Sequence, residues 1–130
     1  MSGFLLDTNV ISELMKPRGT PEVIQWVSSI PESLLYLSAI TIGEIRRGID
    51  LLPEESTKRT ALQSWLDRDV RLRFDGRLLP FDDDVAERWG HLDAIAKKRK
   101  RTIPTIDAML AATALHHGLT FVTRNVKDVE

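Results

Sequence analysis

The sequence contains no cysteine, no long hydrophobic run and almost no net charge, and each absence excludes a class of protein. Without cysteine there is no disulfide, zinc–thiolate site, iron–sulfur cluster or thiol nucleophile, so any metal must be held by oxygen or imidazole. No apolar run approaches the roughly 18 residues of a membrane span. The first residues lack the basic segment of a signal peptide and lead directly into Asp7. We therefore expect a cytoplasmic protein without membrane association.

The composition is that of an ordinary globular protein. The chain has 130 residues, of which 42% are hydrophobic and 28% charged, and this suits a single domain over residues 1–130 with its own core. The net charge of −1 gives no global indication of nucleic-acid binding. The charges are nevertheless clustered, with acids at Asp82–Asp84 and five consecutive bases at Lys97–Arg101. These clusters suit the start and the end of one helix, and a phosphate-contacting role for the bases stays open as the alternative.

Short apolar runs alternate with helical patterns along the chain. Strands are expected at Phe4–Leu6, Leu34–Leu37, Leu78–Phe81 and Leu119–Thr123. Between them, hydrophobic residues recur at helical spacing in segments that begin near Val10, Pro21, Thr41, Pro53, Asp82 and Thr105. This alternation predicts an α/β fold, a three-layer α/β/α sandwich with a mostly parallel central sheet of four to five strands.

The last predicted helix carries Asp107 in its first turn. The residues that follow, Ala108–Leu115, are apolar on every side of a helix, which predicts a buried helix. A carboxylate in that position is costly to desolvate unless the helix N-terminus, a hydrogen bond or a metal ion compensates it. A purely structural alternative makes Thr105 the N-cap and leaves Asp107 beside the free N–H groups.

Several acids are expected to meet at one edge of the sheet, because parallel strands and the helices that follow them share that edge. Asp7 ends the first strand, Glu44 lies in the first turn of the helix after the second strand, and Asn125 and Asp128 follow the fourth. Asp107 begins a helix that also starts there. Convergent carboxylates repel one another and need a cation. Oxygen ligands favour Mg²⁺ or Mn²⁺, which can activate water against a phosphodiester bond.

Each acid also has an ordinary structural interpretation. Thr41 and Glu44 fit a capping box, in which the glutamate only satisfies a helix N-terminus. Asp7 suits an N-cap of the helix after the first strand. Asp128 lies near the chain end, where acids are usually solvated.

Five ordered blocks of the sequence resemble the motifs of PIN-domain toxins of the VapC and FitB type. The blocks are Phe4–Glu13, Leu37–Arg46, Leu79–Asp82, Asp107–Ala114 and Thr123–Asn125. They follow the family's order and span almost the whole chain. The resemblance implies a PIN-like fold and a Mg²⁺- or Mn²⁺-dependent endoribonuclease. Such an enzyme is the toxin of a type II toxin–antitoxin pair and hydrolyses RNA phosphodiester bonds with a metal-activated water.

The same resemblance assigns roles to single residues. Asp7, Glu44 and Asp107 match the invariant acidic positions, which implies catalysis and metal ligation. Asn125 stands where many relatives carry a fourth aspartate. Because an amide adds no negative charge, Asn125 and Asp128 are expected to be weak ligands only. The positions that contact substrate or support the site in the family are matched by Thr8, Asn9, Arg46 and Thr123.

Partners follow from the resemblance as well. They are an RNA substrate and a cognate small DNA-binding antitoxin, whose C-terminal segment covers the toxin groove. Family members usually form homodimers, which assemble with antitoxin into heterotetramers or larger complexes and reach operator DNA only through the antitoxin. Relatives commonly continue into a further strand, whereas this chain stops at Glu130. A truncated chain or an exposed sheet edge is therefore expected.

Two alternatives remain beside this hypothesis. Asn125 and the short C-terminus are compatible with a catalytically weak PIN-like module that binds or regulates. A phosphotransferase with Asp7 as nucleophile is disfavoured, because such enzymes require a second aspartate where this chain has Asn9.

Overall fold

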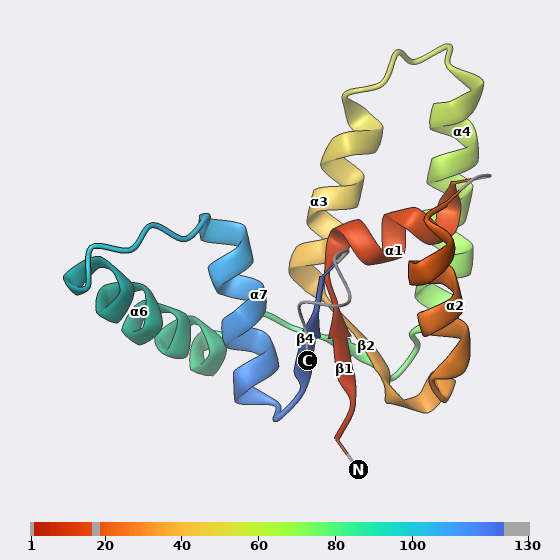
Figure 1. The fold of residues 1–130 in the computed structure, drawn as a ribbon. Helices are drawn as coiled ribbons and strands as arrows, with labels where there is room; N and C mark the ends of the chain where they lie inside the picture. Colours follow the sequence, from red (N-terminus) through yellow and green to blue (C-terminus); the bar gives the residue numbers. More distant parts are fainter. Residues whose placement is uncertain (1, 17–18, 124–130) are drawn as a thin grey trace.

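The computed structural model describes residues 2–16 and 19–123. Its central sheet contains strands β1 (Phe4–Leu6), β2 (Leu35–Ser38), β3 (Leu78–Leu79) and β4 (Thr120–Val122). The strands lie in the order β3-β2-β1-β4 (Figure 1), and each neighbouring pair is parallel. In this register Phe4 lies opposite Leu35 on one side and Thr120 on the other. The prediction of a parallel α/β sheet is confirmed.

Helices make every connection between successive strands. The segment between β1 and β2 contains α1 (Thr8–Met15), α2 (Pro21–Ser29) and the 3₁₀ turn η1 (Glu32–Leu34). The segment between β2 and β3 contains α3 (Ala39–Asp50), α4 (Thr57–Ser64), the π-helix η2 (Trp65–Val70) and α5 (Arg71–Arg73). The segment between β3 and β4 contains α6 (Asp83–Lys98) and α7 (Thr105–His116). Figure 1 shows α7, with α6 beyond it, on one side of the sheet and α1 and α2 on the other.

The strand side chains fill both layers between sheet and helices. Leu6 and Val122 belong to the main apolar cluster, together with Val10 of α1 and Ile45 of α3. Leu5 points to the opposite face and is fully buried outside that cluster. Burial on both faces explains why the strands read as continuous apolar runs instead of alternating ones. Within the described ranges, no helix combines the length and the apolar character needed to span a bilayer.

Helix α3 starts earlier than the sequence predicted. Ser38 is its N-cap, and the Ser38 hydroxyl oxygen accepts a hydrogen bond of 3.0 Å from the Ile40 N–H. The predicted capping box of Thr41 and Glu44 is therefore wrong, because Ser38 already satisfies the helix start. Thr41 is fully buried inside the first turn. Glu44, placed by prediction in the first turn, projects from the second turn and is free for another role.

Helix α7 also differs from expectation. Thr105 is its first residue instead of its N-cap, and Pro104 occupies the cap position without a side-chain hydrogen bond. The helix is not buried on every side: Leu110 is fully buried, whereas Leu115 is 54% exposed. An all-apolar helix has no polar face by which its sequence could reveal the exposed side.

Two arginines, Arg73 and Arg77, form hydrogen bonds at the edge of the sheet. Arg73 donates to both carboxylate oxygens of Glu32 at 2.9 and 3.0 Å. Arg77 donates to the backbone carbonyls of Glu32 and Leu35, and both guanidinium groups lie over the ring of buried Phe74. The Arg73 and Arg77 guanidinium groups hold the pKa of Glu32 below its ordinary value. The start of β2 is thus tied to the segment that leads into β3.

Candidate active site

Asp7 lies immediately after β1, at the carboxyl edge of the sheet. Its backbone N–H donates to the Val122 carbonyl of β4 at 2.8 Å, and its own carbonyl accepts from the Val10 N–H of α1 at 3.0 Å. Asp7 occupies the N-cap position of α1, but its side chain forms no capping hydrogen bond. The carboxylate is only 7% exposed, and the N–H groups of Thr8 and Asn9 at the start of α1 favour its charge without a capping hydrogen bond.

The electrostatics of Asp7 reveal its neighbours. Burial raises the pKa of Asp7 above its ordinary value, and the carboxylates of Asp107 and Glu44 raise it further. The backbone N–H groups of Thr8 and Asn9 lie close enough to lower the pKa in part. Repulsion of this kind requires short distances. The structure thus brings Asp7, Glu44 and Asp107 together from three separate segments of the chain.

Hydroxyl groups hold Glu44 in place. The Thr8 hydroxyl donates to Oε1 of Glu44, and the Thr8 Oγ1 lies 3.1 Å from the Thr41 Oγ1. A hydroxyl has a single proton to donate. Since the proton of Thr8 goes to the carboxylate, Thr41 is the donor in the contact between the two hydroxyls. A chain of hydrogen bonds from Thr41 through Thr8 to Glu44 therefore joins α3 to the start of α1.

Thr41 was missed as a site residue by sequence reasoning. Its hydroxyl suggested a helix cap, although it lies three residues before Glu44 and hence on the same face of α3. That spacing is the signal that could have identified it once the helix start was placed at Ser38.

Asp107 comes from α7, which lies on the opposite side of the sheet from α1 (Figure 1). It lies in the first turn of α7 and is exposed, in contrast to buried Asp7. Helix α7 packs against β1 and α3, which precede and carry the other two acids. The three carboxylates therefore differ in environment: Asp7 is buried, Glu44 is half-buried and hydrogen-bonded, and Asp107 faces solvent.

The remaining predicted site residues are more peripheral. Asn9 is exposed in the first turn of α1, and Thr123 directly follows β4. Arg46 forms an ion pair with Asp67 of η2 and not with a carboxylate of the site. Asn125 and Asp128 lie outside the described residues.

A cavity of about 590 Å³ opens beside Glu44 and Thr8. Its walls include residues of α1, α3, α4 and η2, with Met15, Ile49 and Trp65 among the lining residues. The acidic site therefore continues into a recess that is mostly apolar.

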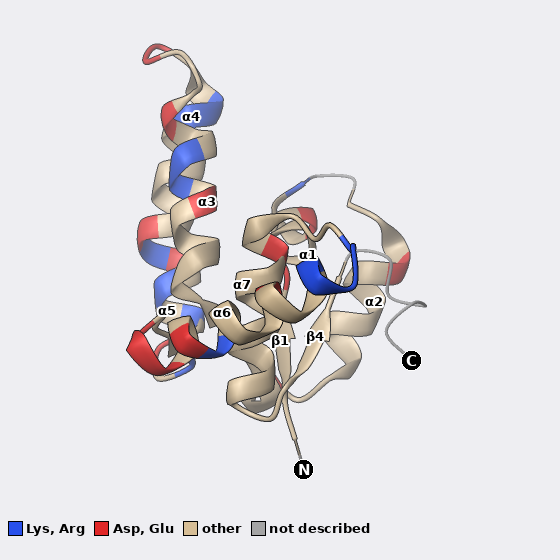
Figure 2. Ribbon diagram, turned by 90° about the vertical axis from the view of Figure 1, so that its left-hand side faces the viewer, with Lys and Arg blue, Asp and Glu red and all other residues tan. Residues whose placement is uncertain are grey.

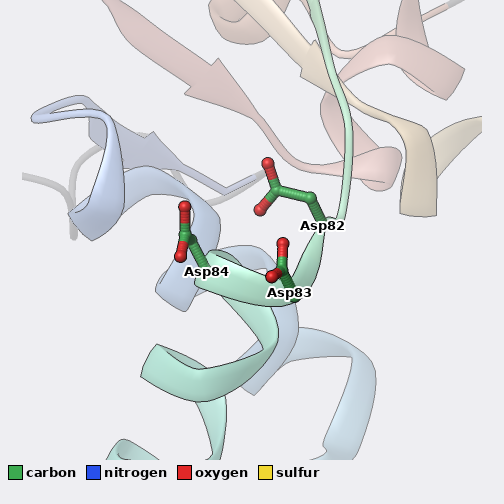
Figure 3. A group of neighbouring side chains, drawn as sticks. All are labelled: Asp82, Asp83 and Asp84. Atoms are coloured by element: carbon green, nitrogen blue, oxygen red, sulfur yellow. The ribbon is translucent and has the colours of Figure 1, made fainter.

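A second acidic group lies at the start of α6. Figure 3 shows Asp82, Asp83 and Asp84 side by side, with carboxylate oxygens within 4.8 Å of one another. All three are exposed, and Asp82 caps α6 by accepting a hydrogen bond of 3.1 Å from the Val85 N–H. The helix start predicted for these acids is confirmed. Their closeness follows from adjacent positions at a helix N-terminus, which favours negative charge.

The spacing of the two acidic groups bears on metal binding. Among the residues with described positions, only the Asp82–Asp84 group has three carboxylates this close, so the oxygens of Asp7, Glu44 and Asp107 lie further apart. Mg²⁺ usually keeps several water ligands and uses only one or two protein carboxylates directly. A set of hard oxygen donors with mutual repulsion and one buried member fits such a cation, because the positive charge offsets both penalties.

Comparison with known proteins gives consistent matches over this fold. The model of a family described as the PIN domain matches residues 4–127. A protein named Toxin FitB from Neisseria gonorrhoeae is 40% identical over 93% of this chain and 86% of its own length. A protein named VapC ribonuclease Y4jK from Sinorhizobium fredii is 40% identical over 97% of this chain and 89% of its own length.

A solved structure agrees with these sequence matches. The structure of FitAB bound to a DNA fragment contains a chain that is 37% identical to this one, with a TM-score of 0.86. The match covers 97% of this chain and 87% of that chain. The segments that carry Asp7, Glu44 and Asp107 all fall within the residues that the family model matches.

Proposed function

Because the chain belongs to the PIN-domain family, we propose that it is a metal-dependent endoribonuclease that acts as the toxin of a toxin–antitoxin pair. Two relatives that are 40% identical over most of the chain, one named a toxin and one a ribonuclease, support this proposal. The observation that carries it is that Asp7, Glu44 and Asp107 meet at one sheet edge, where the carboxylates of Asp107 and Glu44 raise the pKa of Asp7.

The proposed cofactor is Mg²⁺ or Mn²⁺. Asp7, Glu44 and Asp107 would hold it, with Asn125 and Asp128 as weaker candidates. When bound, such a cation lowers the pKa of a water molecule and stabilises the charge that develops on a phosphodiester.

The chain's own residues contribute position and charge. Hydrogen bonds to β4 and α1 fix the backbone of Asp7, and the residue is only 7% exposed. Thr8 and Thr41 hold the Glu44 carboxylate through their hydroxyl groups. Asp107 is exposed and reaches the site from the solvent side. Rigid mounting of this kind is what a catalytic constellation needs from its scaffold.

The proposed partners are RNA, a second copy of the chain and a small DNA-binding antitoxin. A relative that is 37% identical was solved as FitAB bound to DNA, which supports a complex of this kind for the present chain. The apolar cavity beside Glu44 offers a groove that an antitoxin segment would cover, and operator DNA would be reached only through the antitoxin.

Asp7→Asn tests the catalytic assignment. The variant keeps a side chain of the same size but loses the charge, so we expect it to abolish RNA cleavage and to relieve growth arrest on expression. Circular dichroism should show an unchanged fold. Asp83→Asn is the matched control, because it removes one exposed carboxylate from the other acidic group. Equal loss of cleavage in both variants, or full cleavage by Asp7→Asn, would contradict the assignment.

Calorimetric titration with Mn²⁺ tests the metal. Binding should be lost in Asp107→Ala and retained in Asp83→Ala. Equal binding by wild type and Asp107→Ala would remove Asp107 from the metal site. A wild-type protein that binds RNA without cleaving it would instead favour the binding or regulatory module.

A further inference from the structure

A run of exposed basic residues, which we call the row, lies at the end of α6 and directly after it. Figure 2 shows the basic run as a blue stretch at the end of this helix. Lys97 forms an ion pair with Asp93, with 3.1 Å between Nζ and Oδ2. The four residues after it are exposed and form no ion pair with any residue whose position is described, namely Lys98, Arg99, Lys100 and Arg101.

The backbone at the end of α6 fixes this row. The Arg101 N–H donates to the Ala96 carbonyl at 2.8 Å, and the Lys100 N–H donates to the Lys97 carbonyl at 3.0 Å. This pattern is a Schellman motif, whose left-handed position is usually glycine. Here Lys100 occupies it with a φ of 57°. A lysine is therefore held in a conformation that L side chains rarely adopt, and a helix end of defined direction presents the cations.

The row lies close to the candidate site along the chain. Only Thr102, Ile103 and Pro104 separate Arg101 from α7, which carries Asp107 in its first turn. Asp107 follows Arg101 by six positions, a distance of at most roughly 20 Å along the chain. Helices α6 and α7 also pack against each other. The cations are thus held within a few nucleotides' length of the acidic site.

The cations of this row offset the electrostatic repulsion between the acidic site and RNA. Three carboxylates repel a polyanionic substrate, and the net charge of the whole chain is only −1. Attraction of RNA must therefore come from a local concentration of cations and not from the protein as a whole. Lys98 to Arg101 are four adjacent, exposed cations that form no ion pair within the described part of the chain.

We propose that Lys98, Arg99, Lys100 and Arg101 form a phosphate-binding surface, which holds the RNA backbone a few nucleotides from the bond that is cleaved. This inference rests on the proposed ribonuclease function and names the residues that position its substrate. The contact is to phosphates, so it attracts RNA without regard to base sequence.

Lys100→Gly gives the sharpest test, because it separates binding from stability. Glycine suits the left-handed backbone, so the melting temperature should rise by roughly 3 °C. Loss of the cation should lower RNA affinity by roughly threefold, as expected for one exposed charge contact. A purely structural role for Lys100 predicts the stability gain without the loss of affinity.

Binding is measured in the Asp7→Asn background, by fluorescence anisotropy of a labelled single-stranded oligouridylate at several salt concentrations. The slope of log K against log salt should shrink by about 0.7 for each phosphate contact that is lost. Arg68→Gln is the matched control, because Arg68 is exposed on η2, forms no ion pair with a residue of described position, and its loss changes the net charge equally. Equal effects of Lys100→Gly and Arg68→Gln, or no measurable binding of the oligouridylate at low salt, would overturn the inference.

A triple variant extends the test to catalysis. Lys98→Gln, Arg99→Gln and Arg101→Gln together should weaken binding at least tenfold and raise KM while kcat changes little. If wild type cleaves RNA and the triple variant binds and cleaves equally well, the inference fails while the proposed function stands. If wild type cleaves no RNA but the triple variant still loses binding, the proposed function fails and the surface remains an RNA-binding one.

Discussion

Replacement of Thr41 by valine removes one buried hydroxyl and little else. Thr41 is fully buried, and its hydroxyl lies 3.1 Å from that of Thr8, which in turn donates to Glu44. Valine has nearly the same shape, so the main change is the loss of one hydrogen bond, worth about 1 kcal/mol. We expect the melting temperature to fall by roughly 4 °C for a chain of this length.

The same free energy sets the scale of the functional effect. Without Thr41, the Thr8 hydroxyl loses the donor that fixes its rotamer, and Glu44 is held less firmly. If all of this hydrogen bond serves to position Glu44, kcat/KM should fall about fivefold, which corresponds to ~1 kcal/mol. Mn²⁺ affinity, measured by calorimetry, should fall by a similar factor. Thr41→Ser keeps the hydroxyl and should restore most of both quantities.

Thr113→Val is the matched control for this experiment. Thr113 is also fully buried, and its hydroxyl donates to the Met109 carbonyl at 2.9 Å within α7. Its loss should cost similar stability without changing kcat/KM or Mn²⁺ affinity. The reasoning is refuted if Thr41→Val behaves like Thr113→Val in all three measurements. A Thr8→Val/Thr41→Val double variant should lose no more activity than Thr8→Val alone, since both hydroxyls act on one carboxylate.

Three further predictions concern stability. The pKa of Asp7 is raised, so its charge opposes folding at neutral pH. Asp7→Asn should therefore increase the free energy of unfolding in EDTA at pH 7. Urea titrations should show this gain vanishing as the pH falls below 3.8, the ordinary pKa of an aspartate. Glu13 has its pKa lowered to about 2 by Lys16 and Thr20, so wild type should lose stability as pH falls from 4.5 to about 2. Glu13→Gln should lose less stability than wild type over this range in acid denaturation, and the remaining loss should come from other carboxylates such as Glu32. Arg77→Met should cost about 2 kcal/mol in urea denaturation, because the carbonyls of Glu32 and Leu35 both lose their donor. Arg71→Met at an exposed position should change stability by less than ~0.5 kcal/mol.

The meeting of the acids was predictable because it depends on topology. Parallel strands place the residue after β1 and the starts of the following helices on one edge, and this holds whatever the side-chain details. Asp7, Glu44 and Asp107 therefore came together as the pattern of strands and helices predicted. Local signals were equally sufficient for α6, since Asp82 is a strong cap and the basic run suits a helix end.

Other features depended on choices that the sequence leaves open. Ser38 and Thr41 are both good N-caps, and pairing of Ser38 with Leu79 in the sheet decides that the strand ends and the helix starts at Ser38. The partner of Arg46 was unpredictable for a different reason. Asp67 lies in the π-helix η2, where the wider turn changes the face on which each residue appears. A regular helical pattern could not place Asp67 opposite Arg46.

The hydrogen bond from the Asp7 N–H to the Val122 carbonyl has a consequence for how the protein is made. A ribosome produces β4 only after β1 and all the helices between the two strands have been translated. Until β4 emerges and pairs with β1, one flank of the Asp7 backbone lacks its partner, and such long-range pairing forms late in folding. The acidic centre therefore gains this backbone support only after all the helices between β1 and β4, and β4 itself, have left the ribosome.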